Sequence, residues 1–223
     1  MEKSQADALA VLLTNSHAEN FKLINSQPEL KRYGMFKAAS VKIAKGDLSF
    51  YDGHPATLKI LIKSFMLNPS QQKETPYMIV DIDDRCGWIK LMRFVGNKHA
   101  ELNTETVCIL LSEDRTVTNS FGFRYEHPER FEGNKHGFFH IQPIVRDSSA
   151  VDLPGRSPWL PDNFPTFYMF ATCAFELALY TIHSLAGWEP LSQLQVRSRD
   201  SNGVLKHLVR VGDSSRLPYP FNS

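Results

Sequence analysis

The chain has 223 residues, 42% hydrophobic and 22% charged, an ordinary globular composition that excludes extensive disorder. Its 25 lysines and arginines nearly balance its 24 acidic residues, so no overall field draws it to nucleic acid or to an anionic membrane. The three widely spaced cysteines suggest no disulfide framework and the N-terminus has no secretion signal, so we expect a cytoplasmic protein.

The N-terminal part of the chain predicts one helix followed by strands. Apolar residues recur at helical spacing over residues 5–24, and Gln27-Pro28 interrupts them. Two short strands are predicted at 38–43 and 48–51, with a Lys-Gly-Asp turn between them. Residues 58–66 fit both a helical stripe and strand alternation, and two β-branched isoleucines favour the strand.

A series of short strands follows, and a linker ends it. The strands are predicted at 77–82, 87–94, 107–111, 121–126 and 138–145. Because no helical pattern separates them, they predict an antiparallel meander. Proline, serine and aspartate dominate residues 146–163, which we interpret as a linker.

A long apolar helix is predicted after the linker, over residues 164–185. Glu176 is its only formally charged side chain and would be costly in lipid, so we expect a buried helix and no membrane span. The tail, 191–211, fits one more helix or a pair of strands. We therefore predict an α+β fold: a single domain, residues 1–223, with helices packed on an antiparallel meander sheet. A division into a sheet region, 1–145, and a helical region, 164–223, is the alternative.

Histidines and aromatic residues gather between residues 121 and 143, which hold three of the eight histidines. If this segment is a hairpin with His127 opposite His136, directly opposed residues share a face, and His140 lies on the same face. A shift of one residue in register would divide the histidines between two faces.

Such a face predicts metal-independent phosphodiester chemistry. The candidate catalytic residues are His127, His136 and His140, two of which would act as acid and base. The candidate substrate-binding residues are Arg124, which would hold the phosphate, with Tyr125 and Gln142. The alternative is that the histidines are structural, exposed beside a loop or bonded in the core.

Neither a metal nor another cofactor is expected. His136 and His140 stand four residues apart on a predicted strand, about 13 Å, too far for one zinc ion. Asp81 and Asp83 share a face and could hold Mg²⁺, but we expect them to mark a strand that enters a turn. No phosphate-binding loop or nucleophile elbow occurs in the sequence.

Three short stretches resemble segments of known protein families. His140-Ile141-Gln142 is distantly similar to the His-x-Gln ending of the active-site strand in histidine-triad-type nucleotidyltransferases, which would make His140 a nucleophile; Phe138 stands where that family has another histidine. Residues 121–143, together with 157–165 (Ser-Pro-Trp-Leu-Pro-Asp-Asn-Phe-Pro), resemble uncharacterised prokaryotic proteins encoded beside mobile-element and defence genes. The hairpin is also similar to small toxins of toxin–antitoxin pairs.

The defence and toxin resemblances imply a component of a bacterial defence or toxin module. We therefore predict an accessory or effector subunit that acts through contacts with a protein partner or a second copy of the chain. The alternative function is a metal-independent phosphodiesterase or ribonuclease that acts on RNA or a nucleotide. The sequence does not decide whether the protein is an enzyme.

Overall fold

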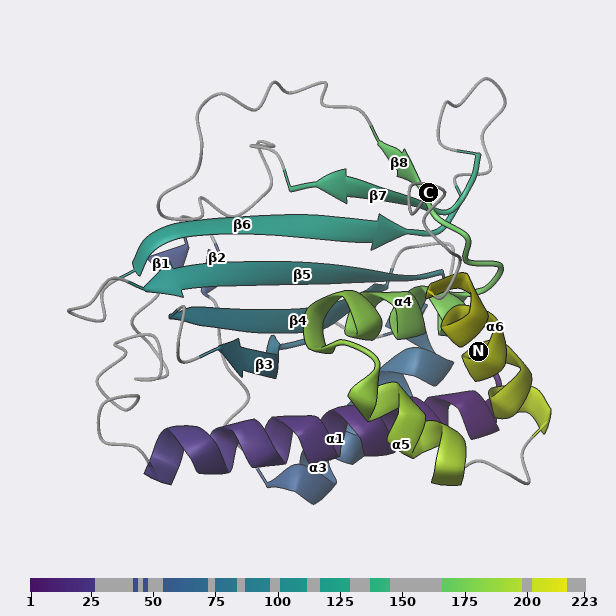
Figure 1. Cartoon of the computed structure of the whole chain (residues 1–223), viewed down its shortest axis with the longest axis horizontal. Coiled ribbons are helices and arrows are strands. Elements are labelled where there is room, and N and C mark those ends of the chain that lie inside the picture. Colours follow the sequence, from purple (N-terminus) through teal and green to yellow (C-terminus); the bar gives the residue numbers. More distant parts are fainter. Residues whose placement is uncertain are drawn as a thin grey trace, which may run out of the picture.

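An antiparallel sheet forms the centre of the molecule (Figure 1). The computed structural model describes residues 1–26, 42–43, 46–47, 54–71, 75–83, 87–96, 101–111, 117–128, 137–144, 166–197 and 202–215. Within them, six strands lie side by side in chain order: β3 (Met78–Asp83), β4 (Trp88–Gly96), β5 (Leu102–Leu111), β6 (Val117–Glu126), β7 (His140–Pro143) and β8 (Phe167–Tyr168). The predicted meander is therefore confirmed, and with the helices it gives an α+β fold.

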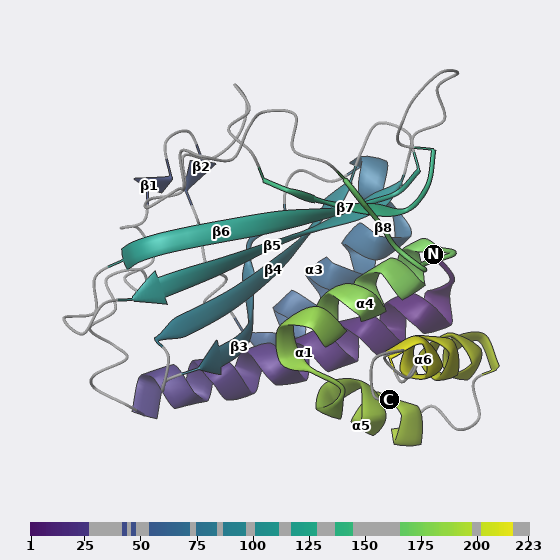
Figure 2. The same ribbon diagram turned by 45° about the horizontal axis from the view of Figure 1, so that its top comes forward.

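Helices cover one face of this sheet. They are α1 (Lys3–Ser26), α3 (Pro55–Leu67), α4 (Ala174–Ala186), α5 (Glu189–Arg197) and α6 (Asn202–Ser215), with a short 3-10 helix, η2 (Pro69–Gln71). Figures 1 and 2 show α1 and α4 on the same side of the sheet, with α5 and α6 packed beside them. A separate two-stranded pair, β1 (Lys42–Ile43) and β2 (Gly46–Asp47), lies on the other side (Figure 2).

The main core lies between the sheet and these helices. Met92 and Phe94 of β4, alternate residues that share a face of the strand, belong to one buried cluster with Leu9 and Leu13 of α1. On β5 the helix-facing position is polar: Thr104 Oγ1 lies 2.8 Å from Thr181 Oγ1 of α4, and both threonines are fully buried. Because the Thr181 hydroxyl donates to the Leu177 carbonyl at 2.7 Å, Thr104 donates to Thr181, and both buried hydroxyls are satisfied.

A smaller core lies under the outer strands. Tyr125 of β6 and Phe139 pack against Leu177 of α4 and against Met169 and Ala171, the residues that follow β8. This second cluster ties the C-terminal helices to the β6–β7 part of the sheet. The outer strands therefore have an apolar face of their own against α4.

The predicted strand at 58–66 is wrong, because this segment is helix α3. Its first turn has Pro55 near the start, and the His54 side chain accepts a hydrogen bond from the Ala56 amide, as an N-cap does. Leu58, Ile62 and Phe65 form a buried stripe with helical spacing. The helical period and the cap therefore outweigh the strand preference of the two isoleucines.

The long apolar helix predicted from residue 164 is also wrong. Helix α4 begins only at Ala174, and Phe167–Tyr168 is an edge strand that pairs with β7. Apolar composition alone does not distinguish a short strand from the start of a helix. Cys173, the residue just before α4, has extended backbone. Gly187 ends α4, with a φ of 75°. The tail is helical, but it forms two helices, α5 and α6, instead of the single helix or the pair of strands that the sequence suggests. The predicted linker at 146–163 lies outside the described residues.

Among the helices that the structure describes, none has the length and apolar character required to cross a bilayer. The prediction that Glu176 belongs to a buried helix is confirmed, because Glu176 is fully buried in α4.

Candidate functional site

The register between β6 and β7 differs from the predicted hairpin. His140 pairs with Glu126, and Gln142 pairs with Arg124. The predicted hairpin has Phe123 opposite His140, three positions away, and an odd shift exchanges the two faces of one strand relative to the other. The predicted single face of histidines is therefore wrong. His136 lies outside the described residues.

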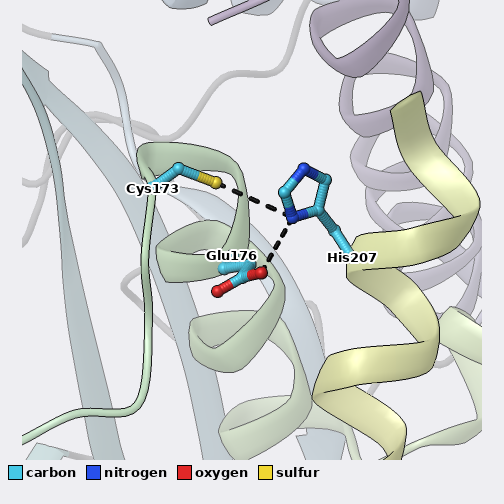
Figure 3. A group of neighbouring side chains, drawn as sticks. All are labelled: Cys173, Glu176 and His207. Atoms are coloured by element: carbon cyan, nitrogen blue, oxygen red, sulfur yellow. Dashed lines mark hydrogen bonds and ion pairs between the residues drawn. The ribbon is translucent and has the colours of Figure 1, made fainter.

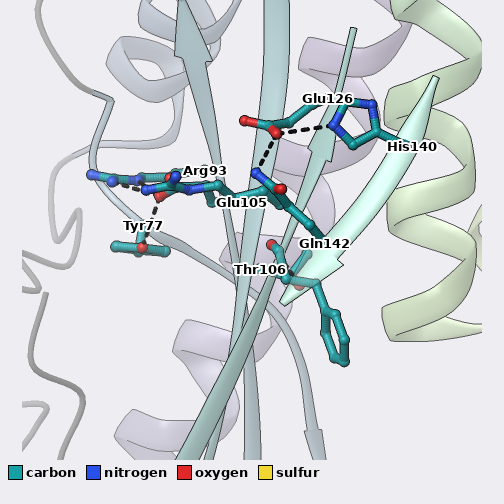
Figure 4. Close-up of polar contacts among 9 residues, drawn as sticks. Tyr77, Arg93, Glu105, Thr106, Glu126, His140 and Gln142 are labelled. Atoms are coloured by element: carbon teal, nitrogen blue, oxygen red, sulfur yellow. Dashed lines mark hydrogen bonds and ion pairs between the residues drawn. The ribbon is translucent and has the colours of Figure 1, made fainter. Parts of the chain in front are cut away.

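The structure brings Arg124, Gln142 and His140 together on the face of the sheet away from α4. Figure 4 shows this face, on which polar side chains from β4, β5, β6 and β7 form a row. Arg93 of β4 lies opposite Glu105 of β5, Glu105 lies opposite Arg124 of β6, and Arg124 lies opposite Gln142 of β7. Directly opposed side chains in a sheet are close neighbours, which explains the row.

Glu105 is the centre of this row (Figure 4). Its Oε2 accepts a hydrogen bond from Arg93 Nε at 2.6 Å, and its Oε1 accepts one from Arg124 Nε at 3.0 Å. The Tyr77 hydroxyl donates to the same carboxylate over 3.3 Å, and the Arg93 guanidinium lies 4.8 Å from the centre of the Tyr77 ring. Burial raises the pKa of the Tyr77 phenol well above its usual range, although Arg93 opposes this.

Glu126 and His140 form a second group beside it (Figure 4). His140 is fully buried, and its Nδ1 lies 2.8 Å from the Phe138 carbonyl, to which it can only donate. Its Nε2 lies 3.3 Å from Glu126 Oε2, which also accepts a hydrogen bond from Gln142 Nε2. Nδ1 is thus engaged by the Phe138 carbonyl and Nε2 faces the Glu126 carboxylate in a fully buried position, so neither nitrogen is placed to attack a phosphate.

Tyr125 and His127 lie on the opposite side of the sheet, the side that faces α4. The Tyr125 hydroxyl lies 2.8 Å from Ser184 Oγ of α4, and burial raises the pKa of this phenol. The His127 ring packs edge-on against Phe139, with ring centroids 4.6 Å apart, and its Nδ1 lies 3.7 Å from Glu101 Oε1. His127 and His140 thus belong to two different groups of side chains and do not meet at one centre.

Sequence reasoning missed the residues that organise this face, Tyr77, Arg93, Glu105 and Glu126. A signal was present for Arg93, which interrupts a largely apolar strand, whereas Glu105 stands among polar residues of β5. A charged residue at such a position is rarely buried without a partner.

Asp81, which the sequence suggests as a possible Mg²⁺ ligand, instead forms an ion pair across the β3–β4 ladder. Lys90 Nζ lies 2.6 Å from Asp81 Oδ2, and it also donates a hydrogen bond to the Leu185 carbonyl at 3.0 Å. The carboxylate therefore has a structural partner within the β3–β4 ladder.

A cleft of about 310 Å³ lies between α1, α5 and β3. Its polar wall includes Ser16 and Asn20, which both donate hydrogen bonds to the Val80 carbonyl at 3.0 Å. Glu19, Asp81 and Glu189 line it, but no histidine, cysteine, lysine or arginine is among the described lining residues, so the cleft has no cationic side chain to hold a phosphate.

An exposed aromatic surface lies at the β8 end of the sheet. We define the aromatic edge as Phe167, Tyr168 and Phe170, whose residues are 51%, 61% and 61% exposed. Tyr168 lies 5.7 Å from Phe138 and 5.3 Å from Phe170, measured between ring centroids. Phe167, the neighbour of Tyr168 on the strand, points to the other face of the sheet. Large exposed aromatic side chains along one edge are typical of surfaces that bind another macromolecule.

Comparison with known proteins assigns no family: no protein-family model, no curated protein and no solved structure matches this chain.

Proposed function

We propose that this protein is a binding subunit of a protein assembly and that it contacts its partner through the aromatic edge. The observation that carries the proposal is the exposure of Phe167, Tyr168 and Phe170, each more than half exposed, on and beside the last strand of the described sheet. The row of polar side chains on the face away from α4 (Arg93, Glu105, Arg124, Gln142 and His140) also supports a role in binding and not in catalysis. Its arginines are bound to Glu105, and its histidine is buried, so these groups have structural roles.

The edge of the sheet explains how such a contact forms. β8 pairs with β7 through His140–Tyr168 and Ile141–Phe167, and no further strand lies beyond it in the part of the chain that the structure describes. An edge strand has backbone N–H and C=O groups that can pair with a strand of another chain. Aromatic side chains on that strand add apolar area to the same contact.

A second copy of this chain is the partner that the structure favours. Pairing two β8 strands about a two-fold axis continues the antiparallel order of the whole sheet, and a net charge of +1 causes little repulsion between copies. If each aromatic side chain has a surface of about 200 Å², the exposed fractions of the three residues give roughly 700 Å² of exposed aromatic surface on two copies. This is more than half of the approximately 1,200 Å² that a small specific interface buries.

The setting of this assembly is proposed from the resemblances of the sequence. Residues 121–143 and 157–165 support a role as accessory or effector subunit in a bacterial defence or toxin-type complex. The aromatic edge supplies the protein–protein contact that such a role requires.

Sedimentation velocity across the micromolar range tests the contact. Wild-type protein is expected to self-associate, and the double variant Tyr168→Ser, Phe170→Ser to do so at least about tenfold more weakly, the loss of roughly 1.4 kcal/mol of contact energy. Ile60→Ser is the matched control, since Ile60 is 70% exposed but lies on α3. The proposal would be overturned if the wild-type protein stays monomeric, or if Ile60→Ser weakens self-association as much as the double variant does.

A metal-independent phosphodiesterase acting on RNA or a nucleotide is the second candidate. It is favoured by His127, which is partly exposed and has Glu101 beside it, because a carboxylate next to a histidine can orient a general base. With His140 buried and Arg124 bound to Glu105 on the opposite face of the sheet, this activity depends on His127 and His136 as acid and base. Cleavage of RNA that survives EDTA and disappears in His127→Ala would establish it; the absence of cleavage by the wild type would exclude it.

A further inference from the structure

A second group of chemically active side chains lies where α4 begins. Cys173 is the N-cap residue of α4, Glu176 lies in its first turn, and His207 comes from α6. Figure 3 shows the three side chains pointing toward one another across the two helices. One ligand atom from each, a sulfur, an oxygen and a ring nitrogen, lies within 4.8 Å of the other two.

The thiol and the carboxylate approach the same nitrogen of His207. Nδ1 lies 2.8 Å from Glu176 Oε1 and 3.9 Å from Cys173 Sγ. A cysteine–histidine–carboxylate catalytic triad uses opposite ring nitrogens for the nucleophile and for the carboxylate, so this arrangement is not a triad. Three different ligand atoms converging on one point are instead the arrangement that a bound cation requires.

The separations suit a zinc ion. With Zn–S near 2.3 Å and Zn–N and Zn–O near 2.0–2.2 Å, neighbouring ligands of a tetrahedral ion are about 3.3–3.7 Å apart. The separations of 2.8 and 3.9 Å from Nδ1 fall on either side of this range. All three atoms lie within 4.8 Å of one another, so the sulfur and the carboxylate oxygen would move closer together by up to about 1 Å when they close on an ion. A thiolate, an imidazole and a carboxylate are all common zinc ligands.

Glu176 is held in the orientation that a ligand needs. Its side chain is 1% exposed, and its second oxygen, Oε2, accepts hydrogen bonds from the Thr172 amide at 2.8 Å and from the Thr172 hydroxyl at 2.7 Å. These bonds fix the carboxylate with Oε1 directed at His207. Groups that orient a ligand through its other atom are a regular feature of metal sites.

The competing explanation is a helix cap with an ion pair. Glu176 occupies the position from which a carboxylate caps the first turn, and Arg210 Nε lies 3.6 Å from its Oε2. The cap and the ion pair explain the contacts of Glu176 Oε2. They give no role to Cys173, whose sulfur faces the same His207 nitrogen as Glu176 Oε1. Arg210 is also half exposed, at 50%, so its charge is largely screened by solvent.

We infer that Cys173, Glu176 and His207 bind a divalent zinc-like cation that fastens α6 to α4. Binding releases the thiol proton and any proton on Nδ1 to solvent, and the charges of thiolate and carboxylate balance those of the ion. Three protein ligands leave the fourth position to water. The site is independent of the proposed binding function, because it needs no second chain.

The test uses the full chain, stripped with EDTA and then titrated with Co²⁺ and Zn²⁺. Wild-type protein should bind one equivalent, show the ultraviolet charge-transfer absorption of a cobalt–thiolate bond, and unfold at a higher temperature with zinc than without. Cys173→Ser should lose the absorption and bind at least about tenfold more weakly. Serine is a favourable N-cap residue, so this variant keeps the start of α4 intact.

Two further variants make the outcome decisive. His207→Ala should also bind at least about tenfold more weakly. Cys108→Ser, which removes a half-buried thiol elsewhere in the fold, should behave as the wild type does. Equal metal affinity in wild type and Cys173→Ser, or a cobalt–thiolate absorption that depends on Cys108, would overturn the inference.

Discussion

Replacing Glu105 by glutamine tests whether the polar row holds the sheet together. The substitution keeps the size and shape of the side chain and removes its negative charge. The Arg93 and Arg124 guanidiniums, which share this carboxylate in the native protein, would then face a neutral amide. The expected result is a large loss of stability with no change in the fold.

The magnitude follows from burial. The Glu105 and Arg93 side chains are only 8% and 13% exposed, so water cannot replace the lost partner. Removing one member of a buried ion pair costs about 3–5 kcal/mol, and the amide oxygen that remains is still an acceptor, so we expect the lower end, about 3 kcal/mol. Arg124 is 28% exposed and contributes less. For a chain of this size, a loss of about 3 kcal/mol corresponds to a fall in Tm of roughly 6–12 °C.

The assay is urea and thermal unfolding followed by circular dichroism. Asp7→Asn is the matched control, the same change of carboxylate to amide in the ion pair between Asp7 and Lys63. Those side chains are 42% and 32% exposed, so about 0–1 kcal/mol is expected. If both substitutions cost the same amount, burial does not determine the strength of the Glu105 network, and the reasoning fails.

Two further predictions concern backbone packing and alkaline pH. Gly96→Ala should cost about 1–3 kcal/mol in urea unfolding, because its Cβ would collide with the Pro69 carbonyl, whereas Gly137→Ala, which meets nothing within 4 Å, should be within about 0.5 kcal/mol of wild type. A similar cost at both glycines would contradict this. Burial raises the pKa of the Cys108 thiol from 9.0 to about 11. The folded state therefore favours the protonated thiol, and this contribution is complete below about pH 9 and lost as the pH rises through about 11. Tm should fall less steeply over that range in Cys108→Ala, and parallel curves would refute the assignment.

The meander could be predicted from the sequence because its signals are local. Each strand carries β-forming residues bounded by turn residues, and no helix period intervenes. The helix at 58–66 is harder to recognise because short apolar runs fit both periods, and the signal that favours a helix is the N-cap at His54, outside the run itself. The start of α4 is equally hard to locate because residues 167–172 are as apolar as the helix, while the pairing of Phe167 and Tyr168 with β7 is a contact between distant segments.

The candidate site depended on a register that local residues do not determine. Strand pairing fixes which side chains share a face, and a shift by an odd number of residues exchanges the faces. The sequence could place His140 and Gln142 on one face, since they are two residues apart on one strand, and the structure confirms that pair through their shared contact with Glu126. It could not place His127 relative to them, because the intervening segment sets the offset between the strands.

Two buried carboxylates in this fold have different capacities for chemistry. Glu105 has each oxygen bound to an arginine, and arginine remains charged at any ordinary pH, so the group is saturated and structural. Glu176 has one oxygen held by Thr172 and the other directed at a histidine 31 residues away, with a thiol facing the same nitrogen. Imidazole and thiol can both lose a proton and bind a metal, which arginine cannot. The partner of a buried carboxylate, more than its burial, therefore decides whether the site can bind a ligand.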